Sequence, residues 1–391
     1  MYSENNNNKL VICQLAHYAP AFYGNFMASL FDLEEKIKQR NKNNKMIYVF
    51  FRNTLNCEWA KEMAQNNKNI YFLSKNKIKM FMELNKIMKH NNVNILHLHY
   101  KVPIISCILL KLIFPDIKIT AHFHNMISEV IVKEWYINIL RKIKGKLKVI
   151  RNVFLCNSVI DIFCGVSEAV FLDLIHCKMD KRKCCIVDNG IDFSRLDNNV
   201  EDGKEIYNLK NKKVLMVYGR DFYTKGVDIA INAVKDIVEK YNIVLMIVCQ
   251  NKDFVLKQIK NMLDTIPEWI IIMPPQENIA FYFKMSDIYL TPSREEGFSY
   301  NLLEAIYCGT LTIRSDHPAM DRKIPGELVV RVNDVPALRQ CIESALNLSD
   351  NDQQAALTVQ KEYIVQRWNI DIWSDKIINM YLKVLNNEYP I

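Results

Sequence analysis

The sequence predicts an α/β protein with two domains, each a parallel sheet covered by helices on both faces. Its 391 residues exceed the usual size of a single hydrophobic core, which favours two domains. Short apolar runs alternate with amphipathic segments along the whole chain, and this alternation is typical of parallel sheets. The polar segment 194–212 separates two such series and is the best candidate for a linker.

The apolar runs define the expected strands. In the first half they are Leu10–Leu15, Met46–Phe51, Ile70–Leu73, Ile95–His99, Ile117–His122, Ile162–Val166 and the short Ile186–Val187. In the second half they are Lys213–Tyr218, Ile243–Cys249, Ile270–Met273, Ile288–Leu290, Leu311–Arg314 and Leu328–Val330. Helical periodicity is clear in Phe26–Lys38, Lys77–Met88, Val227–Val238, Tyr300–Tyr307 and the tail Val359–Asn387. We therefore expect one domain at residues 1–195 and a second at 205–364, with a C-terminal helix in 365–391 that crosses back onto the first.

The composition is that of a soluble enzyme, with 50% hydrophobic and 24% charged residues. The first residues lack the basic-then-apolar pattern of a secretory signal, and the apolar run 102–110 is too short to span a bilayer. The eleven cysteines are scattered without metal-ligand spacing, which favours reduced thiols. We expect a cytoplasmic protein.

The positive charge is concentrated in the first half of the chain. Residues 1–200 contain 29 Lys and Arg against 17 Asp and Glu, a net charge of +12, whereas residues 201–391 contain 22 against 26. The excess gathers at Lys75, Lys77 and Lys79 and in Arg141–Lys148. Such a surface could meet an anionic membrane at the inner face or a diphosphate-linked acceptor, or it could be an ordinary solvated face. Nucleic acid is not an expected partner, because no nucleic-acid-binding motif accompanies the charge.

The segment Pro292–Gly309 carries the most informative motif. It follows an apolar strand, turns at Gly297 and enters the expected helix Tyr300–Tyr307. Glu296 precedes the turn and Glu304 lies one turn inside the helix, so two carboxylates can accept hydrogen bonds from one polyhydroxylated ligand. The helix N-terminus can face an anion. The pattern favours a sugar-nucleotide site, although a plain strand-loop-helix with surface glutamates has the same spacing.

A second motif, Gly219–Gly226, directly follows the strand Lys213–Tyr218. Arg220 and Lys225 place two cations in a loop at the carboxyl end of a strand, where open α/β sheets bind ligands. An Arg fork and a compact Lys charge both suit a diphosphate. Gly24 similarly follows the first strand and precedes a helix. Because neither half contains Gly-x-Gly-x-x-Gly, a dinucleotide-dependent dehydrogenase is disfavoured.

Together these motifs resemble the family 4 retaining glycosyltransferases, which have the GT-B architecture of two Rossmann-like domains facing across a cleft. The matching residues are Gly219-Arg220, Lys225-Gly226, Ser293, Glu296-Gly297-Phe298, Leu303-Glu304-Ala305 and Gly309, with Asp161–Val170 and Asn189–Asp192 between the halves. They occur in the family's order over residues 9–380.

The resemblance implies a role for each residue of the two motifs. Arg220 and Lys225 would hold the donor diphosphate and stabilise the leaving nucleotide, so that no metal is needed. Glu304 would bind the ribose, and Glu296 the donor sugar. The remaining implied donor contacts are Gly24, Gly219, Gly297, Phe298, Ser299 and Leu303. No cofactor is implied besides the nucleotide sugar, for which UDP is favoured.

Two histidine pairs, His97/His99 and His122/His124, alternate along two expected strands of the first half. Members of a pair share one face of the sheet. The resemblance places a histidine of Thr120–Asn125 at the reaction centre, and we favour His122, with a register uncertain by two residues between it and His124. Four histidines could also bind a metal, but buried structural histidines are the simpler interpretation, and no metal site is expected.

We therefore expect a retaining, metal-independent hexosyltransferase that moves a sugar from a nucleoside diphosphate to a saccharide or lipid-linked glycan. Bacterial surface polysaccharide biosynthesis is the expected context. Two alternatives remain open at this point: a sugar-nucleotide epimerase or phosphorylase on the same fold, and a non-catalytic glycan-binding partner that stabilises a sister transferase. Slow release of nucleoside diphosphate from the donor would distinguish the transferase.

Overall fold

The computed structural model describes residues 9–66, 69–128, 153–198, 200–320 and 323–389. Within them the chain forms two compact units. The first unit comprises Met1–Gly190 and Ile370–Ile391, and the second comprises Ile191–Asn369. The basic segment Arg141–Lys148 lies outside the described residues. Among the described helices, none is long and apolar enough to cross a membrane.

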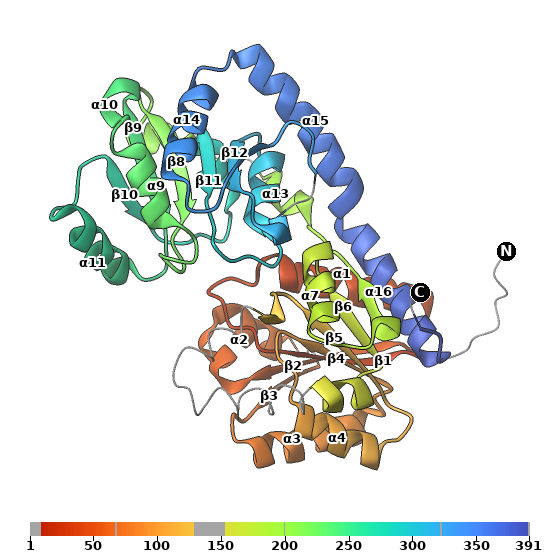
Figure 1. Cartoon of the computed structure of the whole chain (residues 1–391). Helices are drawn as coiled ribbons and strands as arrows, with labels where there is room; N and C mark the ends of the chain where they lie inside the picture. The colour runs from red at the N-terminus through yellow and green to blue at the C-terminus, as the bar shows by residue number, and fades with distance from the viewer. Residues whose placement is uncertain (1–8, 67–68, 129–152, 199, 321–322, 390–391) are drawn as a thin grey trace, which may run out of the picture. The chain divides into compact units, whose positions relative to one another are not determined.

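A parallel sheet forms the centre of the first unit (Figure 1), and in the described residues it has seven strands in the order β3-β2-β1-β4-β5-β6-β7. The strands are β1 (Val11–Ala16), β2 (Lys45–Phe51), β3 (Ile70–Leu73), β4 (Ile95–His99), β5 (Lys118–Phe123), β6 (Ile162–Gly165) and β7 (Cys184–Ile186). The central strands are buried on both faces, which is why they read as continuous apolar runs in the sequence.

Helices cover both faces of this sheet. The described ones are α1 (Gly24–Arg40), α2 (Glu58–Gln65), α3 (Lys77–Asn91), α4 (Ile104–Ile113), α7 (Glu168–His176) and the C-terminal α16 (Ile370–Leu385), with short 3₁₀ turns at Arg52–Asn56 and Lys181–Lys183. Helix α16 packs beside α1 (Figure 1), and its Trp373 and Tyr381 join the core that Phe26 and Ile37 of α1 also line. The last helix of the chain is thus an integral part of the first unit.

The second unit repeats the plan with strand order β10-β9-β8-β11-β12-β13, again with every described strand pair parallel. The strands are β8 (Lys213–Tyr218), β9 (Ile243–Val248), β10 (Ile270–Met273), β11 (Ile288–Thr291), β12 (Leu311–Ser315) and β13 (Leu328–Val330). The helices are α8 (Gly203–Ile206), α9 (Val227–Val234), α10 (Val238–Tyr241), α11 (Lys252–Leu263), α12 (Ala280–Met285), α13 (Tyr300–Tyr307), α14 (Val335–Leu346) and α15 (Asp350–Trp368), with 3₁₀ turns at Phe193–Leu196 and Pro318–Met320.

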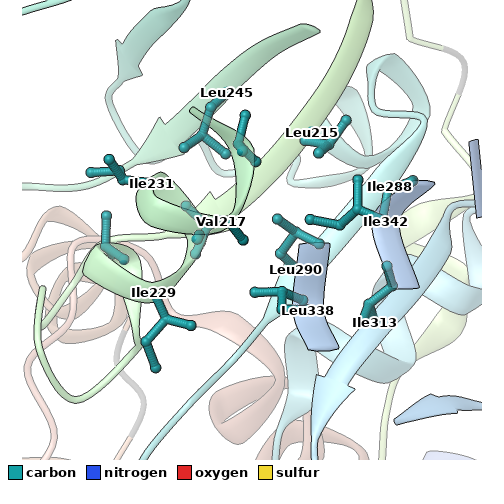
Figure 2. Close-up of a cluster of buried hydrophobic side chains, with 14 of the residues drawn as sticks. Leu215, Val217, Ile229, Ile231, Leu245, Ile288, Leu290, Ile313, Leu338 and Ile342 are labelled. Atoms are coloured by element: carbon teal, nitrogen blue, oxygen red, sulfur yellow. The ribbon is translucent and has the colours of Figure 1, made fainter. Parts of the chain in front are cut away.

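The core of the second unit lies between this sheet and helices α9 and α14 (Figure 2). Ile229 and Ile231 of α9 and Leu338 and Ile342 of α14 meet the strand side chains around Leu290, and all of these are essentially inaccessible to solvent. Burial of each large aliphatic side chain contributes roughly 1.5–3 kcal/mol. This packing holds the sheet in place. It therefore also fixes the carboxyl ends of β8 and β11, where the loop Gly219–Gly226 and the segment Pro292–Gly309 begin.

The tail differs from one continuous helical pattern because Asn369 is extended and separates α15 from α16. Ile191 pairs with Asn369, and its N–H donates to Trp368 O at 2.8 Å, so the chain interrupts the helix where it passes from one unit to the other. The acidic residues Asp350 and Asp352 lie in the first turn of α15. Ser349 caps that turn by accepting a hydrogen bond from Asp352 N–H at 3.2 Å.

Both sheets have the strand order of the doubly wound fold, in which connections depart in opposite directions from the two central strands. In the first unit this switch point lies between β1 and β4, and in the second between β8 and β11. Ligands of such sheets bind beyond the carboxyl ends of these strands.

Candidate functional site

The loop Gly219–Gly226 leaves the carboxyl end of β8 at the switch point of the second unit. Gly219 donates its N–H to Val248 O at 2.8 Å, and a Cβ on it would lie 2.8 Å from the side chain of Ile247. Gly226 has a φ of +68°, and a Cβ there would lie 2.2 Å from Pro292 O. The two motif loops therefore touch at Gly226, and only a residue without a side chain fits this contact.

Lys225 and Glu296 meet across these loops, with Nζ 2.5 Å from Oε1. Glu296 also accepts a hydrogen bond from Ser293 Oγ at 3.0 Å, and Ser293 Oγ lies 3.3 Å from Thr291 Oγ1. The Glu296 side chain is 9% exposed and that of Lys225 is 26% exposed. The carboxylate is thus fixed from two sides, while the Lys225 side chain is partly exposed. Arg220, in the same loop, is exposed.

Arg294 ties the two loops together, a role that the sequence pattern did not reveal. Its guanidinium binds both carboxylate oxygens of Asp228 at 2.7 and 2.8 Å and lies 3.8 Å above the Tyr223 ring. Its backbone N–H donates to Thr224 O at 2.8 Å. A bidentate, stacked arginine is a rigid connection, so Arg294 supports the geometry in which Lys225 meets Glu296.

Glu304 lies near the middle of α13 and is 5% exposed, with Oε1 4.0 Å from Nη1 of Arg195. Burial and the nearby charge of Glu304 raise the pKa of Tyr218 at the end of β8. Tyr289 is close to both carboxylates, since burial and then the charges of Glu296 and Glu304 raise its pKa. The two glutamates therefore belong to one electrostatic environment beside the switch point.

The remaining candidates for donor contacts in the second unit are all buried. Gly297, Phe298 and Ser299 are buried in the turn before α13. Leu303 is fully buried within α13, so its side chain contributes packing. Gly24 begins α1 in the first unit with a φ of +56°. The sequence motif had no signal for Arg195 or Arg294, since an isolated arginine in a loop has many uses.

The histidines gather at the switch point of the first unit, where β1, β4 and β5 end. His122 is 2% exposed and donates Nε2–H to Val187 O at 3.1 Å, and burial lowers its pKa to about 4. Burial also lowers the pKa values of His97, His99 and His124, so all four imidazoles are neutral near pH 7. His97, His99 and His122 hold ligand nitrogens within 4.8 Å of one another, so these three could bracket a metal ion. His124 lies just beyond β5 and is 9% exposed.

The fold has close counterparts among solved structures. A glycosyltransferase from Rickettsia africae superposes with a TM-score of 0.77 at 17% identity, covering 97% of this chain and 99% of that one. HepE of Anabaena, in complex with UDP and glucose, superposes with a TM-score of 0.77 at 13% identity, covering 96% and 100%. These likenesses and the two doubly wound sheets define the fold as GT-B, with two Rossmann-like domains.

The sequence matches define the family. Residues 56–195 match the family described as Glycosyltransferase Family 4, and residues 199–361 match that described as Glycosyl transferases group 1. The chain belongs to the group 1, family 4 glycosyltransferases. N-acetyl-alpha-D-glucosaminyl L-malate synthase of Bacillus anthracis is 23% identical over 257 residues, which are 63% of this chain and 63% of that relative's length.

Proposed function

We propose that the protein is a retaining glycosyltransferase that moves a sugar from a nucleoside diphosphate, with UDP as the favoured nucleotide. The observation that carries this proposal is the contact between Lys225 and Glu296 at 2.5 Å, at the carboxyl ends of the two central strands. A cation for the diphosphate and a carboxylate for sugar hydroxyls thus lie side by side. HepE, which shares the fold, was solved with UDP and glucose.

In this proposal the second unit binds the donor. Lys225 and Arg220 contact the diphosphate and stabilise the negative charge that develops on the leaving nucleotide, a contribution that fixed cations supply without a metal ion. Glu304, held near Arg195, accepts hydrogen bonds from the ribose hydroxyls. Glu296 orients the donor sugar, supported by the backbone of the Gly297 turn and by Ser293.

The first unit then contributes the acceptor and a histidine of the pair His122 and His124. We retain a saccharide or lipid-linked glycan as the acceptor, with surface polysaccharide assembly as its setting. The Bacillus anthracis relative is named for transfer to L-malate, so L-malate belongs in the acceptor panel.

A surface on α3 and α4 supports a membrane-associated acceptor. Ile78 and Met82 of α3 are 74% and 63% exposed, and Ile105 and Leu112 of α4 are 62% and 73% exposed. The exposed lysines Lys75, Lys77 and Lys79 adjoin Ile78 in the sequence. Exposed aliphatic side chains beside lysines suit the interface of an anionic bilayer. We therefore propose that this α3–α4 surface docks on anionic lipid.

Donor hydrolysis tests the enzymatic proposal. Purified protein is incubated with UDP-glucose, UDP-N-acetylglucosamine or GDP-mannose, and the released nucleoside diphosphate is measured with and without acceptors. We expect slow release from one donor, which Lys225→Ala and Glu296→Ala abolish. Lys240→Ala removes an exposed lysine paired with Glu343 and serves as the matched control. Release that is unchanged in both site variants would show that the site is wrongly assigned.

A further inference from the structure

Five buried side chains of the first unit form a continuous hydrogen-bonded chain at its switch point. His97 Nδ1 lies 2.6 Å from Tyr381 Oη, and Gln14 Nε2 donates to the same hydroxyl at 2.8 Å. His99 Nε2 lies 2.9 Å from Gln14 Oε1, and His99 Nδ1 lies 3.2 Å from His124 Nε2. The chain joins the C-terminal helix α16, strands β1 and β4, and the residue just after β5.

The protons along this chain follow from the glutamine. A neutral imidazole has one donor and one acceptor nitrogen, and burial keeps these rings neutral. Because Gln14 Oε1 can only accept, His99 Nε2 carries the proton and His99 Nδ1 accepts. His124 must then donate Nε2–H to His99, which leaves Nδ1 as its acceptor nitrogen.

At the other end of the chain, the Tyr381 hydroxyl links Gln14 to His97. Tyr381 Oη accepts from the Gln14 amide, so its own proton is available for His97 Nδ1. When His97 Nδ1 accepts that proton, the one ring proton of neutral His97 lies on Nε2, a buried atom without a partner. If the Gln14 amide were turned round, each of these donors and acceptors would be exchanged. The Gln14 amide thus sets the tautomers of His99 and His124, and through the Tyr381 hydroxyl it favours the Nε2–H form of His97.

A metal ion is the rival occupant of this cluster. It would need a lone pair from each of His97, His99 and His122. Both nitrogens of His99 are already hydrogen-bonded, and the proton assignment leaves His97 Nε2 as a donor. Of the three residues, His122 alone keeps a lone pair without a partner, on Nδ1. The hydrogen-bonded chain therefore favours tautomer control over metal ligation.

His124 is the member of the chain that a substrate could reach. It is 9% exposed, whereas Gln14, His97, His99 and Tyr381 are each 1% or less exposed. Its ring stacks on Tyr100 with centroids 4.2 Å apart and meets the edge of Phe26 at 5.7 Å, so its plane is also fixed. These contacts fix the orientation of the His124 ring. The hydrogen-bonded chain of side chains determines which of its two nitrogens is the hydrogen-bond acceptor.

We propose that Gln14 and Tyr381 are positioning residues that hold His124 with Nδ1 as a hydrogen-bond acceptor for a substrate hydroxyl. The inference rests on the proposed glycosyltransferase function, and it selects His124 from the pair of candidates. It also gives the C-terminal helix a role, because α16 supplies the hydroxyl that orients Gln14.

Nitrogen-15 NMR of the histidine rings tests the tautomer without any substrate, in full-length wild type, Gln14→Leu and Tyr381→Phe. We expect the Nε2–H form for His124 in the wild type and a mixture of tautomers in Gln14→Leu. Donor hydrolysis is measured in parallel, with an expected fall in kcat of about tenfold or more and little change in KM for the donor. Tyr48→Phe, which removes another buried hydroxyl of the same unit bonded to Glu34, is the matched control and should retain the wild-type kcat.

Three results would overturn the proposal: an Nδ1–H form of His124 in the wild type, unchanged tautomers in Gln14→Leu, or altered tautomers with unchanged kcat. Stoichiometric Zn²⁺ binding that shifts the resonances of His97, His99 and His122 would do the same. If no donor is hydrolysed by the wild type, the proposed function fails, whereas the NMR result still reports on the chain.

Discussion

Lys225 Nζ lies 2.5 Å from Glu296 Oε1, although 71 positions separate the two residues in the sequence. The contact exists because β8 and β11 are neighbours in the sheet and their following loops leave the same edge. Without ligand, each charge offsets the other, so neither is left uncompensated in a largely buried setting. A bound diphosphate would share Lys225, and a sugar hydroxyl would donate to Glu296.

This relationship predicts non-additive effects on catalysis. Lys225→Met and Glu296→Gln should each lower kcat/KM for the donor by about 100-fold, since each removes a preorganised charged group. The double variant should lose less than the product of the two, with a coupling energy of about 1 kcal/mol or more, because the residues contact each other. Measuring kcat/KM for the wild type, the two single variants and the double variant completes a double-mutant cycle. Strictly additive losses of transition-state free energy would show that Lys225 and Glu296 do not act as a unit.

Gly226 and Gly309 offer a matched test of the loop contact. Both have positive φ, +68° and +82°, but a Cβ at Gly226 would lie 2.2 Å from Pro292 O whereas one at Gly309 would meet nothing within 4 Å. Gly309→Ala should cost about 1 kcal/mol of unfolding free energy from backbone strain. Gly226→Ala should cost at least 1 kcal/mol more and weaken donor binding. Urea unfolding measures the loss of unfolding free energy, and nucleotide titration measures donor binding. Equal losses of unfolding free energy in Gly226→Ala and Gly309→Ala would argue against the contact between the two loops.

Arg294→Lys should destabilise the second unit although it keeps the charge. Lysine cannot reproduce the two-oxygen grip on Asp228 or the stacking on Tyr223. We expect a loss of about 1–3 kcal/mol in unfolding free energy, together with weaker donor binding because the loops are less fixed. Arg331→Lys, at an exposed arginine, is the control. Equal stability of the two variants would show that Arg294 does not tie the two loops together.

The buried histidines predict loss of stability in acid. Burial lowers the pKa of His122 in the folded protein to about 4, against about 6.5 in the unfolded chain. Between these values the unfolded chain binds a proton that the folded protein does not, so the free energy of unfolding falls as the pH falls from about 6.5 toward 4. The stabilisation is complete above pH 6.5.

Urea unfolding at several pH values measures this slope. His122→Asn should reduce it by up to about 1.4 kcal/mol per pH unit, the effect of one proton. His90→Asn, at an exposed histidine, should leave the slope unchanged. An identical slope in wild type and His122→Asn would refute the assignment.

The α3–α4 surface predicts binding to anionic vesicles. The double variant Ile78→Ser/Leu112→Ser should reduce co-sedimentation with phosphatidylserine-containing vesicles several-fold, because each exposed aliphatic side chain contributes apolar area to the lipid interface. Added salt should also weaken binding by screening the lysines. Leu348→Ser, which alters an exposed leucine of the second unit, controls for general effects. Equal sedimentation with neutral and anionic vesicles would contradict the proposal that the α3–α4 surface docks on anionic lipid.

Most of the fold could be predicted from the sequence because its strands are continuous apolar runs. Five strands form with the predicted bounds: Ile70–Leu73, Ile95–His99, Lys213–Tyr218, Ile270–Met273 and Leu328–Val330. The remaining predicted strands differ by one or two residues at one or both ends. The two charged motifs were equally visible, since glycines that follow strands mark the ligand-binding edge of such sheets. The sequence alone therefore determined the fold class and the candidate donor residues.

The tertiary structure decided which residues act together. Gln14 and Tyr381 are 367 positions apart and read as ordinary strand and helix residues, yet they share a hydrogen bond because α16 packs beside α1. Arg294, in the loop after β11, likewise gains its role from Asp228, which lies on α9. Local patterns record burial and turns, whereas contacts between distant segments depend on strand order and helix packing. For that reason the sequence could name a histidine pair, and only the folded chain shows that His124 is linked through His99 to Gln14.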